Sequence, residues 1–158
     1  MPGVRKISCL LVVALATALA GCGTEAGSGS GFGDSVDKAH AAKTLTSLQT
    51  GLLTLGVVQA ESGGAAVQDV AAALQAKDPT SRYTTVPPAE PGVVQVQGGG
   101  GGPVMLVAMS DPASEGRPAQ YVAAWQGSGT TMYYTGTAPP AYTAQAPAGA
   151  GWGSTLPQ

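Results

Sequence analysis

Residues 104–109 read Val-Met-Leu-Val-Ala-Met, and this unbroken apolar run decides the fold. Such a run is typical of a β-strand that is covered on both faces. Neighbouring segments rich in β-branched and aromatic residues are expected to be strands as well. They are residues 82–86, 92–97, 121–126 and 130–135, but Pro87, Pro88 and Pro91 bar regular pairing beside the first of them. Because short loops connect successive strands, the sequence predicts a small antiparallel sheet of about four strands.

Two helices are expected ahead of all these strands. The first is indicated by an apolar stripe at helical spacing, made of Ala41, Leu45, Leu48, Leu52 and Leu55. It should begin near Asp34 or Ser35, because either side chain can cap the free N–H groups of a first turn. Residues 65–76 predict a second, shorter helix, which Asp78-Pro79 ends. The predicted fold class is α+β, with an N-terminal amphipathic helix and a short second helix packed on the sheet.

The N-terminus has the features of a secretory signal peptide. Arg5 and Lys6 precede an almost wholly apolar segment, residues 7–20. This segment is shorter than the roughly 20 residues that a helix needs to cross a bilayer. A basic start, a short apolar core and small residues at its end are typical of an export signal. A membrane-spanning anchor is the alternative interpretation, and the glycines that follow argue against it.

Leu19-Ala20-Gly21-Cys22 resembles the lipobox of bacterial lipoproteins. The resemblance covers residues 1–22 and implies that the sulfur of Cys22 carries a diacylglyceryl group and that a peptidase cuts before this residue. Two or more acyl chains make a durable anchor, whereas one holds a protein only marginally. Cys9 would leave with the signal, so no internal disulfide could form. An ordinary exported protein with a chance cysteine is the other interpretation.

These features divide the chain into four parts. Residues 1–21 are the predicted signal peptide, 22–33 a flexible Gly/Ser tether, 34–137 the α+β domain, and 138–158 a Pro/Ala/Gly-rich tail with little expected order. The chain has 7 basic and 9 acidic residues and a net charge of −2. Without a basic patch, nucleic-acid binding is disfavoured. The expected location is extracytoplasmic, on a bacterial membrane.

A second, looser resemblance lies in residues 119–134, which read Ala-Gln-Tyr-Val-Ala-Ala-Trp-Gln-Gly-Ser-Gly-Thr-Thr-Met-Tyr-Tyr. This stretch is similar to the closing hairpin of type IV pilin-like headgroups, and the resemblance of the whole layout covers roughly residues 35–136. It implies one long helix packed on an antiparallel meander. Pilins polymerise through an apolar N-terminal helix with a glutamate near its start, but residues 7–20 contain no acid. The resemblance therefore implies a surface-bound relative rather than a filament subunit.

Few residues have the pattern of a catalytic or metal site. His40 is the only histidine, and a general base needs a positioned partner. Asp111 and Glu115 share a loop, but calcium takes six to eight oxygen ligands. The glycine run 98–102 lacks the Gly-Lys-Ser/Thr ending of a phosphate-binding loop. We expect no catalytic residues, no metal and no cofactor.

Four aromatic residues could line a binding face, and half of them could instead point into the core. They are Tyr121, Trp125, Tyr133 and Tyr134. The sequence thus predicts an envelope lipoprotein that is held on the membrane by lipid on Cys22. Its small, non-enzymatic domain would contact other envelope proteins or polymers. The alternative is a small-molecule-binding or sensory lipoprotein with an aromatic-lined groove.

Overall fold

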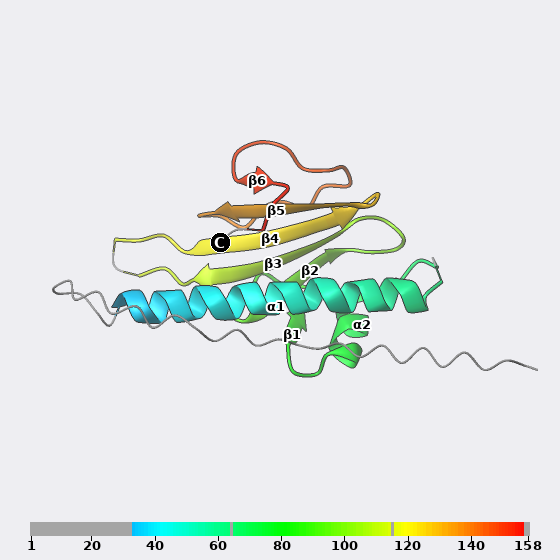
Figure 1. The fold of residues 1–158 in the computed structure, drawn as a ribbon, viewed down its shortest axis with the longest axis horizontal. Helices are drawn as coiled ribbons and strands as arrows, with labels where there is room; N and C mark the ends of the chain where they lie inside the picture. Colours follow the sequence, from blue (N-terminus) through cyan, green and yellow to red (C-terminus); the bar gives the residue numbers. More distant parts are fainter. Residues whose placement is uncertain (1–32, 64, 115, 157–158) are drawn as a thin grey trace, which may run out of the picture.

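The computed structural model describes residues 33–63, 65–114 and 116–156. Within these residues the chain forms two helices and one six-stranded sheet with the order β1-β2-β3-β4-β5-β6. The helices are α1 (Gly33–Glu61) and α2 (Val70–Lys77), and the strands are β1 (Arg82–Thr84), β2 (Val93–Gly98), β3 (Val104–Asp111), β4 (Gln120–Gly127), β5 (Thr130–Gly136) and β6 (Trp152–Gly153). Figure 1 shows α1 lying across one face of the sheet, which we call the front face.

The predicted antiparallel sheet of about four strands in a pilin-like layout is wrong. β1 pairs with β2 in parallel and the other neighbours are antiparallel, so the sheet is mixed. The long helix begins at Gly33 and therefore does not lie at the N-terminus of the chain. Parallel neighbours usually need a long crossover. Here β1 has only 3 residues, so the segment 85–92 can return the chain over a short distance to the start of β2.

The core on the front face lies between α1, α2 and the sheet. Leu48 and Leu55 of α1 are buried there, as the apolar stripe predicts. The sheet contributes alternate residues of its central strands: Val94, Val96, Leu106, Ala108, Val122 and Ala124. A Cβ atom on Gly51 would lie 3.0 Å from Cδ1 of Leu106, so the glycine lets α1 approach β3 closely. The fit at this point explains a glycine in the middle of a helix, where it otherwise destabilises.

One hydrogen bond joins α1 to an irregularity in β3. The register between β3 and β4 shifts between Met109 and Asp111, which leaves the carbonyl of Met109 free to accept from a side chain. The buried hydroxyl of Thr44 donates to that carbonyl over 2.9 Å. This polar group can therefore lie in the core without the cost of an unpaired hydroxyl.

α2 is shorter than the predicted helix over residues 65–76. It begins at Val70, because Asp69 caps it and accepts a hydrogen bond from the backbone N–H of Ala72 over 2.9 Å. Val70 and Leu74 of α2 are buried in the front core, so the helix still presents the expected apolar face.

The opposite face of the sheet, the back face, is covered by the C-terminal segment, residues 137–151. Met105, Val107, Ala123 and Trp125 form a second buried cluster there. The indole N–H of Trp125 donates to the carbonyl of Thr143 over 2.9 Å, and the hydroxyl of Tyr142 donates to the carbonyl of Pro103 over 3.0 Å. The prediction of little order after residue 137 therefore differs from the structure, in which this segment covers the sheet and ends in β6.

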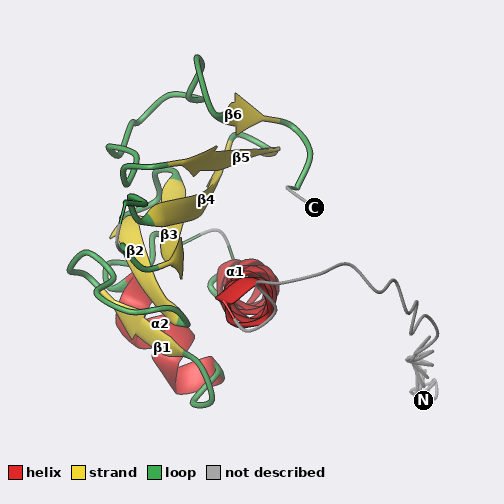
Figure 2. Ribbon diagram, turned by 90° about the vertical axis from the view of Figure 1, so that its left-hand side faces the viewer, coloured by secondary structure: helices red, strands yellow, loops and turns green. Residues whose placement is uncertain are grey.

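β3 is consequently buried on both faces, with Val104 to Ser110 all buried. α1 covers one side of the strand, as Figure 2 shows in a side view. On the other side, the back-face cluster and the hydrogen bonds of Trp125 and Tyr142 place the C-terminal segment. The unbroken apolar run in its sequence predicts this two-sided burial.

Candidate interaction surface

The structure separates the four aromatic residues that the sequence grouped as one interaction face. Side chains alternate along a strand, and the pairing of β4 with β5 places Tyr121, Trp125 and Tyr134 on the back face and Tyr133 on the front face. Only 2% of Trp125 is exposed. These four residues therefore do not form a single exposed face.

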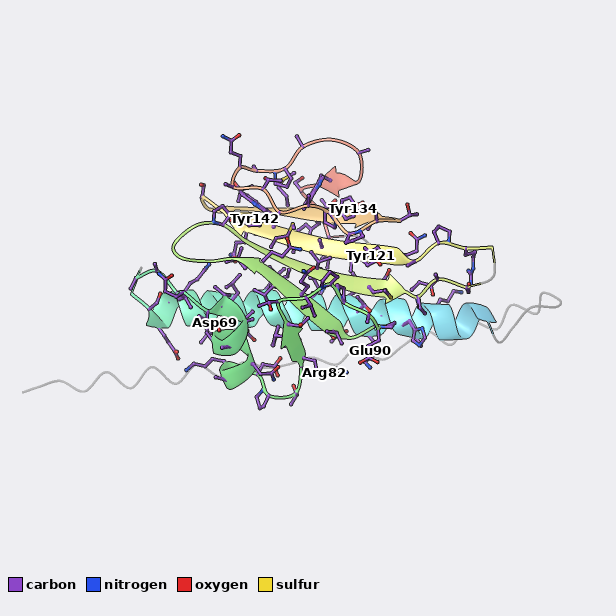
Figure 3. The ribbon with its side chains drawn as sticks, turned by 180° about the vertical axis from the view of Figure 1, so that it is seen from behind. Asp69, Arg82, Glu90, Tyr121, Tyr134 and Tyr142 are labelled. Carbon is purple, nitrogen blue, oxygen red and sulfur yellow. The ribbon has the colours of Figure 1, made fainter. Side chains whose placement is uncertain are left out.

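Most of the aromatic residues on the back face have a packing role. The rings of Tyr134 and Trp152 lie 5.3 Å apart at 48°, and the hydroxyl of Tyr134 donates to the carbonyl of Ala138 over 2.9 Å. Figure 3 shows Tyr121, Tyr134 and Tyr142 on this side of the molecule. The contacts of Tyr134 and Tyr142 hold the C-terminal segment against the sheet, and Tyr121 packs on the buried cluster of the back face.

A groove on the front face is open to solvent. It lies between α1 and β5 and has a volume of about 380 Å³. Its lining is Gln49, Leu52, Leu53, Gln126, Thr131, Tyr133 and Leu156. None of these side chains is charged, and the amides and hydroxyls are interspersed with leucines. The groove can therefore take an uncharged or apolar partner without stripping water from a charge.

The outward side of α1 continues the apolar surface beside this groove. Leu53 is 75% exposed and Val57, one turn later, is 49% exposed. The sequence carries no charged residue from Thr44 to Ala60. Figure 2 shows α1 end-on, with no described element on the side that faces away from the sheet. We call this side the outward face of α1.

Leu53 and Val57 were not predicted as candidate surface residues, because the apolar stripe accounts only for the side of the helix that faces the sheet. The signal is present as two adjacent apolar pairs, Leu52-Leu53 and Val57-Val58. Adjacent residues of a helix lie about 100° apart, so Leu53 and Val57 can be exposed while Leu52 and Val58 lie toward the sheet.

Further hollows lie elsewhere in the fold, and two of them adjoin α1 and β1. One of about 220 Å³ separates the end of α1 from the glycine loop between β2 and β3, and its lining includes Leu55, Gln59 and Gly101. The other, of about 380 Å³, lies beside β1, where Arg82 forms an ion pair with Glu90. Figure 3 shows that pair at the edge of the molecule. Both partners are more than half exposed, so the pair contributes little to stability.

Among the described titratable residues, Asp78 has the largest pKa shift, and it lies where α2 meets β1. Hydrogen bonds from Ser81, Thr80 and Tyr83 lower the pKa of Asp78 from 3.8 to about 2. The hydroxyl of Thr80 donates to this carboxylate over 2.5 Å and that of Tyr83 over 3.2 Å. Burial in turn raises the pKa of Tyr83. These contacts tie the end of α2 to β1, and we assign Asp78 a structural role.

The other polar candidates are not brought together. His40 lies on α1, and its Nδ1 is buried without a hydrogen-bond partner in the described structure. Asp111 ends β3, and Glu115 lies outside the described residues. In the part of the chain that is described, no three His, Cys, Asp or Glu side chains are placed to hold a metal ion. No helix among the same residues is long and apolar enough to span a membrane.

The proposed lipid site, Cys22, and the cleavage residues Leu19, Ala20 and Gly21 lie outside the described residues. Comparison with known proteins gives no match to a family model, a curated protein or a solved structure.

Proposed function

We propose that this chain is an exported bacterial lipoprotein, anchored by lipid on Cys22, whose domain is a non-enzymatic interaction module of the cell envelope. The observation that carries the proposal is the sequence Leu19-Ala20-Gly21-Cys22 at the end of a short apolar segment that follows Arg5 and Lys6. Cleavage before Cys22 would remove no part of the described domain, which begins at Gly33.

The surface of the domain supports an interaction role. The groove between α1 and β5 offers apolar and uncharged polar groups without a nucleophile–base pair. Partners with neutral surfaces, such as other envelope proteins or polymers, fit this composition better than nucleic acid, which needs a cluster of cations.

A small-molecule-binding lipoprotein is the second candidate. The groove beside Tyr133 favours it, since its volume of about 380 Å³ lies in the range of ligand pockets. The lining contains one aromatic residue rather than the four that the sequence suggested. An uncharged ligand that protects Tyr133 and Leu53 from solvent in hydrogen-exchange or NMR titrations would favour this role over protein binding.

The anchor is tested with Cys22→Ser. We expect mass spectrometry of the natural chain to show an N-terminus at Cys22 with attached acyl chains. The variant should carry no lipid, and its domain should remain folded but leave the membrane fraction. Cys9→Ser is the matched control and should be lipidated and located normally. Recovery of the natural chain with Met1 intact and an unmodified Cys22 thiol would refute the proposed function.

A further inference from the structure

We propose that the outward face of α1, centred on Leu53 and Val57, rests on the surface of the membrane that holds the lipid anchor. This inference depends on the proposed function, because it needs the chain to be tethered at Cys22. It adds an orientation to that function: α1 faces the lipid, and the back face of the sheet points away from it.

The composition of this face suits a lipid surface. Leu53 and Val57 are 75% and 49% exposed, and no described element covers them. Exposed apolar side chains lower their free energy when they enter the boundary between lipid headgroups and acyl chains. From Thr44 to Ala60 there is no charged side chain, so contact with lipid desolvates no charge along this part of the helix.

The length of chain between anchor and helix supplies the second argument. If residues 23–32, which separate Cys22 from α1, behave as their Gly/Ser composition suggests, they would reach on the order of 20 Å. α1 has 29 residues and is about 43 Å long. The start of the helix would therefore stay within about half a helix length of the lipid. Tethering raises the effective concentration of the membrane, so a patch too small to bind a free protein can hold a tethered one.

A second copy of the chain fits this face less well. Stable specific interfaces bury roughly 800 Å² on each partner, whereas the exposed large apolar side chains of α1 are Leu53 and Val57 alone among its described side chains. A membrane needs no matching shape, and the tether keeps it in reach.

Docking through α1 would present the back face to the envelope. Tyr121 and Tyr142 lie on that side, together with the C-terminal segment (Figure 3). Partners of the docked domain would then meet this segment or the groove between α1 and β5, and not the outward face of α1.

The experiment uses the full lipidated protein in vesicles of phosphatidylethanolamine and phosphatidylglycerol that contain a nitroxide-labelled lipid. A fluorophore is placed on Gln49→Cys, one turn before Leu53 on the outward face, or on Ala144→Cys in the C-terminal segment. Both positions are exposed. A lipidated Cys22 has no free thiol, so each variant carries one labelling site. We expect the label at position 49 to be quenched at least about threefold more than that at 144, as expected for an interfacial helix.

Substitutions then test which side chains hold the helix on the lipid. Leu53→Gln with Val57→Thr should lower the ratio of docked to undocked protein by about 10- to 100-fold, since it removes much of the apolar burial. Val86→Thr is the matched control, because Val86 is 62% exposed on the loop between β1 and β2 and should leave quenching unchanged. Quenching should persist at high salt, because the contact is apolar.

The outcomes separate the two proposals. Mass spectrometry that finds no lipid on Cys22 refutes the proposed function. Lipidated protein with equal quenching at both positions overturns the inference and leaves the function standing. Two results together would assign the outward face of α1 to a second copy of the chain and overturn the inference. They are a disulfide between two copies of the unlabelled Gln49→Cys variant and the absence of quenching in the labelled variant.

Discussion

Trp125→Phe tests whether the C-terminal segment is part of the folded core. The substitution removes the indole N–H that donates to the carbonyl of Thr143 over 2.9 Å. The lost bond and the unpaired carbonyl should cost about 1–2 kcal/mol. The smaller ring also leaves a void beside Met105 and Val107, both fully buried, at about 1 kcal/mol more. We expect the free energy of unfolding to fall by about 2–3 kcal/mol.

The same substitution at the other tryptophan is the control. Trp152 packs its ring on Tyr134 at 5.3 Å, and phenylalanine can keep that contact, so Trp152→Phe should cost less than about 1 kcal/mol. Urea denaturation, followed by circular dichroism and analysed as two-state unfolding, measures the free energy of unfolding of both variants. If Trp125→Phe costs no more than Trp152→Phe, the segment does not cover Trp125 and the account of the back face fails.

Three further predictions concern the helices. Gly56→Ala should raise stability by about 1 kcal/mol in urea denaturation, because a Cβ there meets nothing within 4 Å; Gly51→Ala should gain less or lose stability, because its Cβ would lie 3.0 Å from a leucine methyl. The folded pKa of Asp78 is lowered from 3.8 to about 2, so its stabilising contribution is present above pH 3.8 and is lost as the pH falls through 2. Asp78→Asn should therefore flatten the acid limb of the urea midpoint plotted against pH, and an unchanged limb would contradict the assignment. Leu74→Ala should destabilise by about 2–5 kcal/mol at its buried position, whereas Leu53→Ala should change thermal stability little, and equal losses would place Leu53 in the core.

The long elements were predictable from the sequence because each contains an extended pattern of apolar residues. The stripe that includes Leu48 and Leu55 defines the buried side of α1, and the six apolar residues 104–109 indicate that β3 is covered on both faces. The short strands differ in this respect. β1 has 3 residues and lies within the expected strand 82–86. β6 has only 2 residues, too few to show a period, and its pairing with β5 decides its existence.

The candidate surface was predictable only in part, for a related reason. Tyr133 and Tyr134 are adjacent, so alternation along β5 sends them to opposite faces. That separation was available from the sequence. The burial of Trp125 was not, because it depends on Thr143 and the rest of a C-terminal segment whose composition suggests a disordered tail.

The groove is open because the sheet has more strands than the sequence predicts. A helix with its side chains is about 10–12 Å wide, and strands lie about 4.8 Å apart, so one helix covers two to three strands. α1 lies over β3 and reaches β2 and β4, and α2 packs beside β1 and β2. A sheet of about four strands would be covered by this arrangement, but β5 extends beyond it and leaves Tyr133 beside Leu52 and Leu53 as the lining of the groove. The apolar groove beside the outward face of α1 therefore follows from a sheet wider than its two helices can cover.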